Sequence, residues 1–139
     1  MELENALQWV TQQNHGILIT IRRDGRPQSS DISFTLKDNK FCISVTETRA
    51  KTKNLQHDNR AVLHVTSPQK WSYVSLSGTV QITPPASDPS DEICQELADI
   101  YRRISGQDHP NWDEFYEAMV EEKRLVLRFI PETVVGQIH

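Results

Sequence analysis

The chain has 139 residues, of which 37% are apolar and 24% charged, a composition typical of one folded domain spanning residues 1–139. No apolar run reaches the roughly 18 residues that a membrane-spanning helix needs, and the acidic first residues do not resemble a signal peptide. A net charge of −4 argues against binding to nucleic acid, which needs a broad excess of basic residues. We therefore expect a cytoplasmic protein that binds a small molecule and neither nucleic acid nor a membrane.

The spacing of apolar residues predicts short antiparallel strands with helices between them. Strands are predicted at residues 17–21, 27–36, 40–45, 61–65, 71–83, 125–130 and 133–138, with Pro131 separating the last two. Helices are predicted at residues 2–13, 49–57, 88–105 and 111–119, the first ended by a left-handed cap at Gly16. Asp24-Gly25 predicts a tight two-residue hairpin, and such short connections exclude a parallel sheet. Strands this short favour a closed or half-open β-barrel.

The basic residues after the third strand lie where cations are disfavoured. Thr48 is predicted to cap the next helix, which places Arg49, Lys51 and Lys53 in its first turn and a half. The N-terminal end of a helix carries positive partial charge, so cations there are unfavourable unless an anion joins them. Free backbone N–H groups and several cations at one point form a seat for a phosphate or carboxylate. The alternative is a solvated basic turn without a ligand.

The rest of the sequence has few groups for catalysis, and no catalytic residue is predicted. It contains no Gly-x-Ser-x-Gly elbow and no Rossmann or P-loop fingerprint. The five histidines are too scattered to predict a metal site, and Cys42 and Cys94 fit reduced core positions. A chain with an anion seat and few acid–base groups either binds a ligand without reaction or takes its chemistry from a cofactor.

Several motifs together carry a family resemblance. Residues 49–55 and 58–61, which follow the hairpin segment 24–28, resemble the pyridoxamine 5′-phosphate oxidase-like split-barrel family. Trp71-Ser72-Tyr73, Gly78-Thr79-Val80 and Trp112-Asp113 resemble its branch that uses the deazaflavin coenzyme F-420, and the likeness runs from about residue 5 to residue 136. The resemblance implies a mainly β fold, a six-stranded antiparallel Greek-key split β-barrel with peripheral helices. It also implies a homodimer with a flavin-type cofactor in each of two clefts at the interface.

The resemblance further implies which residues touch the cofactor. Arg49 and Lys51 would hold its phosphate, which agrees with the anion seat argued from the helix. The remaining implied contacts border the cofactor ring and side chain or form the cleft wall: Gln28, Asp31, Thr46, Ala50, Trp71 and Tyr73. The alternatives are that Trp71 packs on the neighbouring loop, and that Gln28 and Asp31 are exposed strand positions.

The chain also departs from the parent oxidases, which end in a basic segment that holds the substrate phosphate. Residues 134–139 contain no matching Arg-x-His pattern, which argues against oxidation of vitamin B6. The cofactor is expected to be F-420 or FMN. Four basic residues would serve the polyglutamate tail that F-420 adds, or are ordinary surface charge: Lys53, Arg22, Arg23 and Lys70. Two functions follow. One is an oxidoreductase that moves a hydride between the cofactor and a small planar substrate, and the other is a non-catalytic carrier or sensor of the cofactor.

Overall fold

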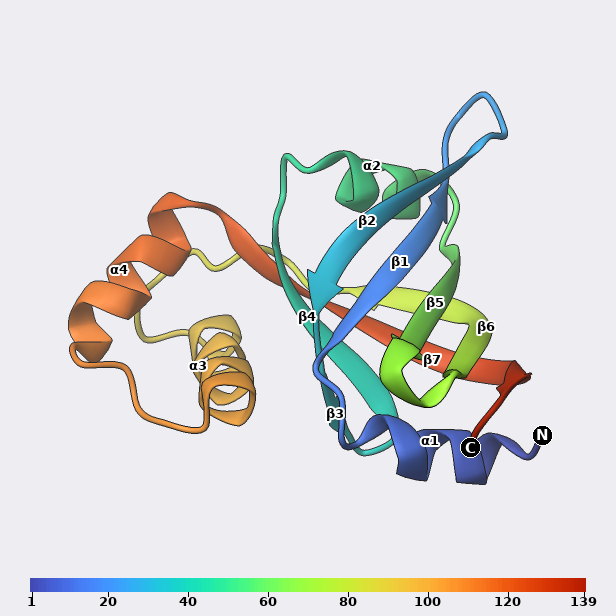
Figure 1. Ribbon diagram of the computed structural model, residues 1–139. Coiled ribbons are helices and arrows are strands. Elements are labelled where there is room, and N and C mark those ends of the chain that lie inside the picture. Colours follow the sequence, from blue (N-terminus) through green and yellow to red (C-terminus); the bar gives the residue numbers. More distant parts are fainter.

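The computed structural model describes residues 1–139, and its centre is a seven-stranded antiparallel sheet that curls into a half-barrel (Figure 1). The strands are β1 (His15–Ile21), β2 (Pro27–Ser33), β3 (Thr35–Lys37), β4 (Lys40–Thr46), β5 (Arg60–Ser67), β6 (Ser72–Ile82) and β7 (Arg124–Gln137). The helices are α1 (Leu3–Val10), α2 (Ala50–His57), α3 (Glu92–Ser105) and α4 (Trp112–Glu121), with a short 3-10 turn η1 (Pro68–Lys70). None of these helices is long and apolar enough to cross a membrane.

The two edges of the sheet meet because one chain segment supplies both of them. The strand order is β2-β1-β5-β6-β7-β4-β3, so the edge strands β2 and β3 are consecutive in sequence. Phe34 joins them: it is buried, and its N–H donates to the Asn14 carbonyl at 2.9 Å. The single strand predicted over residues 27–36 is therefore wrong. The segment changes its partner from β1 to β4 at Phe34, and a local pattern does not show a change of neighbour.

The last strand is continuous, so the predicted interruption at Pro131 is also wrong. Pro131 lies opposite Gly78, where the register of β6 against β7 shifts and leaves Glu132 unpaired. A bulge tolerates proline because the missing N–H is not needed there. A Cβ on Gly78 would overlap the carbonyl oxygen of Ile130, so glycine lets the two backbones approach at this point.

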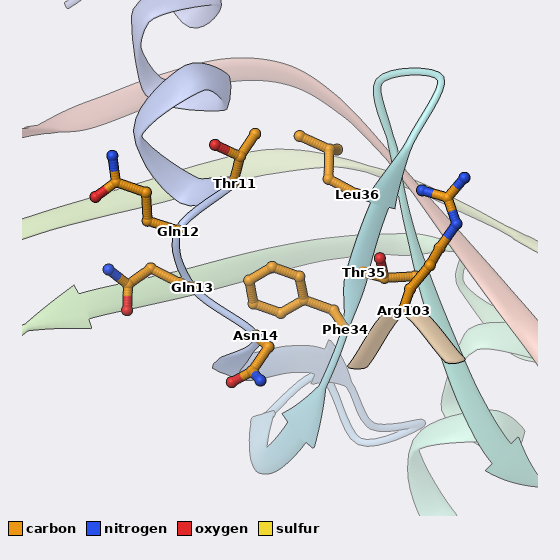
Figure 2. A pocket seen from close by; sticks show the side chains of 8 residues that line it. All are labelled: Thr11, Gln12, Gln13, Asn14, Phe34, Thr35, Leu36 and Arg103. Atoms are coloured by element: carbon orange, nitrogen blue, oxygen red, sulfur yellow. The ribbon is translucent and has the colours of Figure 1, made fainter. Parts of the chain in front are cut away.

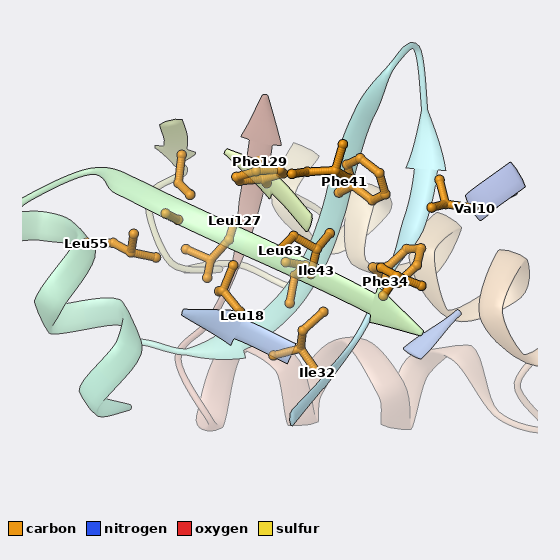
Figure 3. Close-up of a cluster of buried hydrophobic side chains, with 14 of the residues drawn as sticks. Val10, Leu18, Ile32, Phe34, Phe41, Ile43, Leu55, Leu63, Leu127 and Phe129 are labelled. Carbon is orange, nitrogen blue, oxygen red and sulfur yellow. The ribbon is translucent and has the colours of Figure 1, made fainter. Parts of the chain in front are cut away.

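The inward side chains of the strands form the core of the barrel (Figure 3). Phe34, Phe41 and Phe129 pack against one another, with ring centroids 5.2 and 5.9 Å apart for the two neighbouring pairs. A second cluster lies between α3, α4 and the outer face of β4 and β7. It contains Cys42 and Cys94, which are buried and free as predicted. Burial raises the pKa of the Cys94 thiol to about 11, so its reactive thiolate is scarce at neutral pH.

Helices α2 and α3 end at His57 and Ser105 as predicted, but α3 begins at Glu92, four residues after the predicted start at Asp88. The side chain of Asn111 accepts the N–H of Glu114 and caps α4, and Asp91 caps α3 in the same way. By contrast, α1 ends at Val10, and Gly16 lies in β1 and not in a left-handed cap. Gly16 faces the barrel, where a Cβ would lie 3.0 Å from the carbonyl oxygen of His64, so glycine serves close packing there.

Candidate anion-binding site

A pocket of about 340 Å³ opens where β2, β4, the start of β7 and two helices meet. Its polar and charged lining consists of Asp31, Ser33, Ser44, Thr46, Arg49, Lys51 and Arg124. Ile104 of α3 and the β-strand residues Ile32, Ile43 and Val45 supply the apolar lining. Its volume is within the usual range for sites of small ligands. Four predicted site residues are therefore brought together here: Asp31, Thr46, Arg49 and Lys51.

Three cations converge on this pocket with few carboxylates to neutralise them. Arg49 and Lys51 form no ion pair, while Arg124 donates through Nε to Glu122 at 3.1 Å. Burial, together with the charges of Arg49 and Arg124, lowers the pKa of the Lys51 ammonium below its usual value. The only carboxylate in the lining, Asp31, is largely exposed and hydrogen-bonds His15 at 3.2 Å. The arrangement carries net positive charge that an anion would neutralise.

The helix that supplies two of these cations begins without a side-chain cap. Arg49, in an extended backbone conformation, occupies the capping position of α2, so the predicted cap at Thr48 is wrong by one residue. The hydroxyl of Thr48 lies 3.5 Å from that of Thr46 and does not cap a helical N–H. The first N–H groups of α2 and its dipole therefore add to the positive end of the pocket.

Strand pairing places the third cation, which the sequence did not reveal. Arg124 begins β7, and its backbone pairs with Thr46 at the end of β4. The hydroxyl of Thr52 donates to the Thr46 carbonyl at 2.9 Å and ties the start of α2 to the same strand end. Arg124 thus reaches the site from a distant part of the sequence. No spacing rule links it to residues 46–51, and only the register of β4 against β7 could have identified it.

One buried hydroxyl beside the site has no hydrogen-bond partner. Ser30 Oγ is inaccessible to solvent and unpaired, the one side-chain atom of the protein in that state. Side chains alternate along a strand, so Ser30 shares a face of β2 with Gln28 and with Ile32, which lines the pocket. Buried hydroxyls are normally satisfied, so this atom is a candidate contact for a ligand or a bound water.

Two of the predicted contacts do not line the pocket. Gln28 accepts a hydrogen bond of 2.9 Å from the side chain of Asn54, which also donates to the buried Thr20. The amide of Gln28 therefore fastens β2 to α2. Ala50 is the first residue of α2 and is exposed, and its side chain is absent from the lining of the pocket.

The other three predicted residues lie elsewhere on the surface. Lys53 lines a separate hollow with Arg23 and His57. Trp71 is 81% exposed at the end of η1, so it does not pack on the neighbouring loop. Tyr73, on the outward face of β6, stacks on His64 with a centroid distance of 5.5 Å. Within one chain, neither aromatic side chain lines the pocket that holds the cations.

A larger hollow of about 460 Å³ lies between the end of α1, β3 and the last turn of α3 (Figure 2). Figure 2 shows amide side chains along one rim and Arg103 on the other, with Phe34 below them. The guanidinium of Arg103 is already paired with Asp99 at 3.1 Å, and no other cation faces the hollow. It therefore offers less to an anionic ligand than the site at α2.

The fold and the site can now be compared with known proteins. A family model described as pyridoxamine 5′-phosphate oxidase matches residues 3–137. The chain belongs to the pyridoxamine 5′-phosphate oxidase family. This confirms the family resemblance and the mainly β split-barrel fold, with seven strands in the half-barrel where six were expected.

Solved structures with a similar fold include proteins named for different ligands. A conserved hypothetical protein from Mycobacterium tuberculosis is 18% identical, with a TM-score of 0.75, 98% of this chain and 84% of that chain covered. An F420 reductase is 22% identical, with a TM-score of 0.66, 92% of this chain and 94% of that chain covered. An FAD-binding protein from Mesorhizobium loti is 16% identical, with a TM-score of 0.69, 98% of this chain and 92% of that chain covered. A heme storage protein from Vibrio cholerae is 12% identical, with a TM-score of 0.63, 97% of this chain and 94% of that chain covered. At these identities the likeness shows the shared fold.

Proposed function

We propose that the protein is an oxidoreductase that binds a flavin-type cofactor, F-420 or FMN, with the cofactor phosphate in the pocket at α2. The observation that carries the proposal is the convergence of Arg49, Lys51 and Arg124 at an uncapped helix N-terminus. Placing three cations at this point is unfavourable in the free protein: burial first, and then the charges of Arg49 and Arg124, lower the pKa of Lys51. A phosphate would reverse that cost, because it pairs with the guanidinium groups and accepts backbone N–H groups.

The residues of the pocket fit such a group. Arg49 and Arg124 offer planar donor forks to phosphate oxygens, and Lys51 offers a point charge in the same pocket. The hydroxyls of Thr46 and Ser44 line the same pocket and are available to the polar side chain of a cofactor. When bound, a flavin or deazaflavin supplies hydride transfer at its ring. The role of this chain would then be to bind, orient and partly desolvate the reacting groups.

The site's charge alone does not separate the two cofactors, because both carry a phosphate. The F420 reductase with the same fold is the support for F-420, and the FAD-binding protein supports a flavin.

We also propose that the protein acts as a homodimer in which each cofactor lies at the interface. Figure 1 shows α3 and α4 on one side of the barrel, away from β5 and β6. On the side of β5 and β6, Trp71, Tyr73 and Val135 are exposed, and a groove of about 550 Å³ is lined in part by Ile19 and Val62. Apolar side chains gathered on one face favour contact with a second molecule.

Light scattering of the purified protein tests the dimer. The proposal predicts twice the mass of the 16.0 kDa chain and a shift towards the monomer for Val135→Lys. A monomer at micromolar concentration would contradict it. Trp71→Ala provides the link to the site: weaker cofactor binding by that variant would support a partner that completes the cleft.

The alternative function is a non-catalytic carrier or sensor of the cofactor. The pocket lining contains no histidine or cysteine and one exposed carboxylate, and a heme storage protein shares the fold. Both observations favour binding without turnover. An assay of reduced F-420 or reduced FMN with small planar acceptors separates the two: oxidation that scales with enzyme supports the oxidoreductase, and binding without turnover supports the carrier.

A direct test of the phosphate seat compares FMN with riboflavin, which lacks the phosphate. A charged hydrogen bond contributes about 1.5–3 kcal/mol, so loss of a phosphate held by several of them predicts at least a roughly 10-fold weaker affinity for riboflavin. Equal affinities for the two compounds would show that the pocket at α2 does not bind the phosphate.

A further inference from the structure

A polar hollow beside the edge strand β3 is not used by the proposed phosphate seat. This β3 hollow has a volume of about 460 Å³ and lies between the end of α1, β3 and the last turn of α3 (Figure 2). No carboxylate lines it, so it does not favour a cation. Its one cation, Arg103, is paired with Asp99 at 3.1 Å, which leaves less for an anion than the pocket at α2 offers. The charges of the β3 hollow therefore favour an uncharged ligand.

One rim of the β3 hollow carries three amide side chains without partners. Gln12, Gln13 and Asn14 follow α1, and none of the three side chains forms a hydrogen bond within the protein. Figure 2 shows them on one side of the hollow, across from Thr35 and Leu36 of β3. An amide side chain both donates and accepts, so it suits a ligand edge that carries a donor beside an acceptor.

The facing rim is the free edge of β3, which is the last strand of the sheet. Residues 38 and 39, both with positive φ, form the two-residue turn between β3 and β4. The flanking residues Lys37 and Lys40 are then a hydrogen-bonded pair, and Leu36, one residue earlier, faces β4 without hydrogen bonds. The N–H and C=O of Leu36 therefore point away from β4.

This edge of β3 faces the amide rim. Phe34, two residues before Leu36 and thus on the same edge, donates its N–H to the Asn14 carbonyl at 2.9 Å. Leu36 has no such contact with the segment that follows α1. The strand edge and the three amides thus present unpaired donors and acceptors to the hollow from two sides. Backbone groups on a strand edge bind ligands that offer N–H and C=O in return.

The β3 hollow adjoins the pocket at α2. Ser33 lines the pocket and the next residue, Phe34, lines the hollow. On α3 the same division falls between Ile104, which lines the pocket, and Arg103, which lines the hollow. Consecutive Cα atoms are about 3.8 Å apart, so the two sites are neighbours along both elements. A cofactor in the pocket at α2 would lie beside a ligand in the β3 hollow.

We propose that the β3 hollow binds the small planar substrate, and that this substrate is an uncharged ring with an amide or lactam edge. Phe34 and Leu36 supply the apolar part of the lining, which suits the flat face of a ring, while its N–H and C=O meet the amides and the Leu36 backbone. The inference rests on the proposed function, because it takes the reacting cofactor to lie in the pocket at α2. It narrows the substrates to neutral carboxamides and lactams, against acids and amines.

The test is an NMR titration of the isotope-labelled full chain with nicotinamide, a neutral planar carboxamide, and with pyridine, the same ring without the carboxamide. Nicotinamide should saturably shift the backbone N–H signal of Leu36 and the side-chain amide signals of Gln12 and Gln13, and pyridine should not. Loss of a neutral hydrogen bond predicts at least a roughly 5-fold weaker affinity for the double variant Gln12→Ala/Gln13→Ala, read at Leu36. The shifts should persist when FMN or F-420 is bound.

Gln107→Ala is the matched control, since Gln107 is an exposed amide outside the hollow, and it should leave the affinity unchanged. An unshifted Leu36 signal, an equal response to pyridine, or an unchanged affinity of the double variant would overturn the substrate site and leave the proposed function standing. Displacement of nicotinamide by the cofactor would also overturn it, because the hollow and the pocket would then be one site. If neither FMN nor F-420 binds the unmodified protein, the proposed function is wrong and the substrate assignment fails with it.

Discussion

The substitution Lys51→Met should weaken cofactor binding without weakening the fold. Methionine keeps most of the aliphatic length of lysine and removes the charge that lines the pocket with Arg49 and Arg124. A charged hydrogen bond contributes about 1.5–3 kcal/mol, and each 1.4 kcal/mol is about a factor of ten in affinity. We therefore expect the dissociation constant for FMN or F-420 to rise by roughly 10- to 100-fold. Fluorescence titration measures it, with the exposed Lys70→Met as the control.

The same substitution, which lowers cofactor affinity, should not lower the stability of the free protein. Burial and its two cationic neighbours lower the pKa of Lys51, so at neutral pH its charge costs the free protein some stability. Removing the charge should leave the free energy of unfolding equal or raise it by up to about 1 kcal/mol. The Lys51 ammonium holds its proton more tightly in the unfolded chain than in the folded protein. The stability that its charge costs the unmodified protein therefore fades as pH rises through the lowered folded-state pKa towards 10.5. The advantage of Lys51→Met in urea unfolding should therefore shrink in the same pH range.

These two measurements together can refute the reasoning. A Lys51→Met protein that binds FMN and F-420 within about threefold of the unmodified chain would remove Lys51 from the phosphate seat, since a single charged hydrogen bond is worth more than that. A loss of stability of several kcal/mol would instead assign Lys51 to the fold, and weaker binding would then follow from unfolding.

Three further predictions concern the scaffold. Gly78→Ala forces the backbone of β7 at Ile130 away from β6 and should cost about 1–3 kcal/mol of stability, measured by urea unfolding; a neutral change would show that the bulge adapts freely. Asp91→Ala removes the cap of α3 and should cost about 1 kcal/mol. Burial tends to raise the pKa of Asp91, but hydrogen bonds from three backbone N–H groups outweigh burial and lower the pKa below 3.8. The stability that the Asp91 cap contributes is therefore present above pH 3.8 and lost as pH falls through the folded-state pKa. An Asp91→Ala effect on stability that persists in strong acid would contradict this assignment. Glu96→Ala leaves Arg128 without its two-pronged partner and should lower stability by about 1 kcal/mol at neutral pH, unlike Glu117→Ala on the surface of α4.

Features that depend on a few adjacent residues were predictable from the sequence. Asp24-Gly25 predicted the hairpin between β1 and β2, although Arg22 and Arg26 close a loop one residue longer than expected, with Gly25 in the left-handed region. Asn111 predicted the cap of α4 for the same reason, since a cap depends on the next few N–H groups.

Features that depend on distant parts of the chain were not predictable. The change of partner at Phe34 requires knowledge that β1 and β4 lie next to the two opposite edges of the sheet. The continuity of β7 through Pro131 requires a glycine on the facing strand. At the site, the cations at α2 were visible as a local conflict with the helix dipole, whereas Arg124 arrives through strand pairing.

The central claim is that the pocket at α2 binds a flavin-type cofactor through its phosphate. Its most direct test is a titration of the purified protein with FMN and with F-420, followed by cofactor fluorescence. We expect saturable binding of at least one of them, weakened by Lys51→Met and by Arg124→Met and unaffected by Lys70→Met. Binding of neither cofactor would contradict the account and leave Arg49, Lys51 and Arg124 as a seat for a different anion.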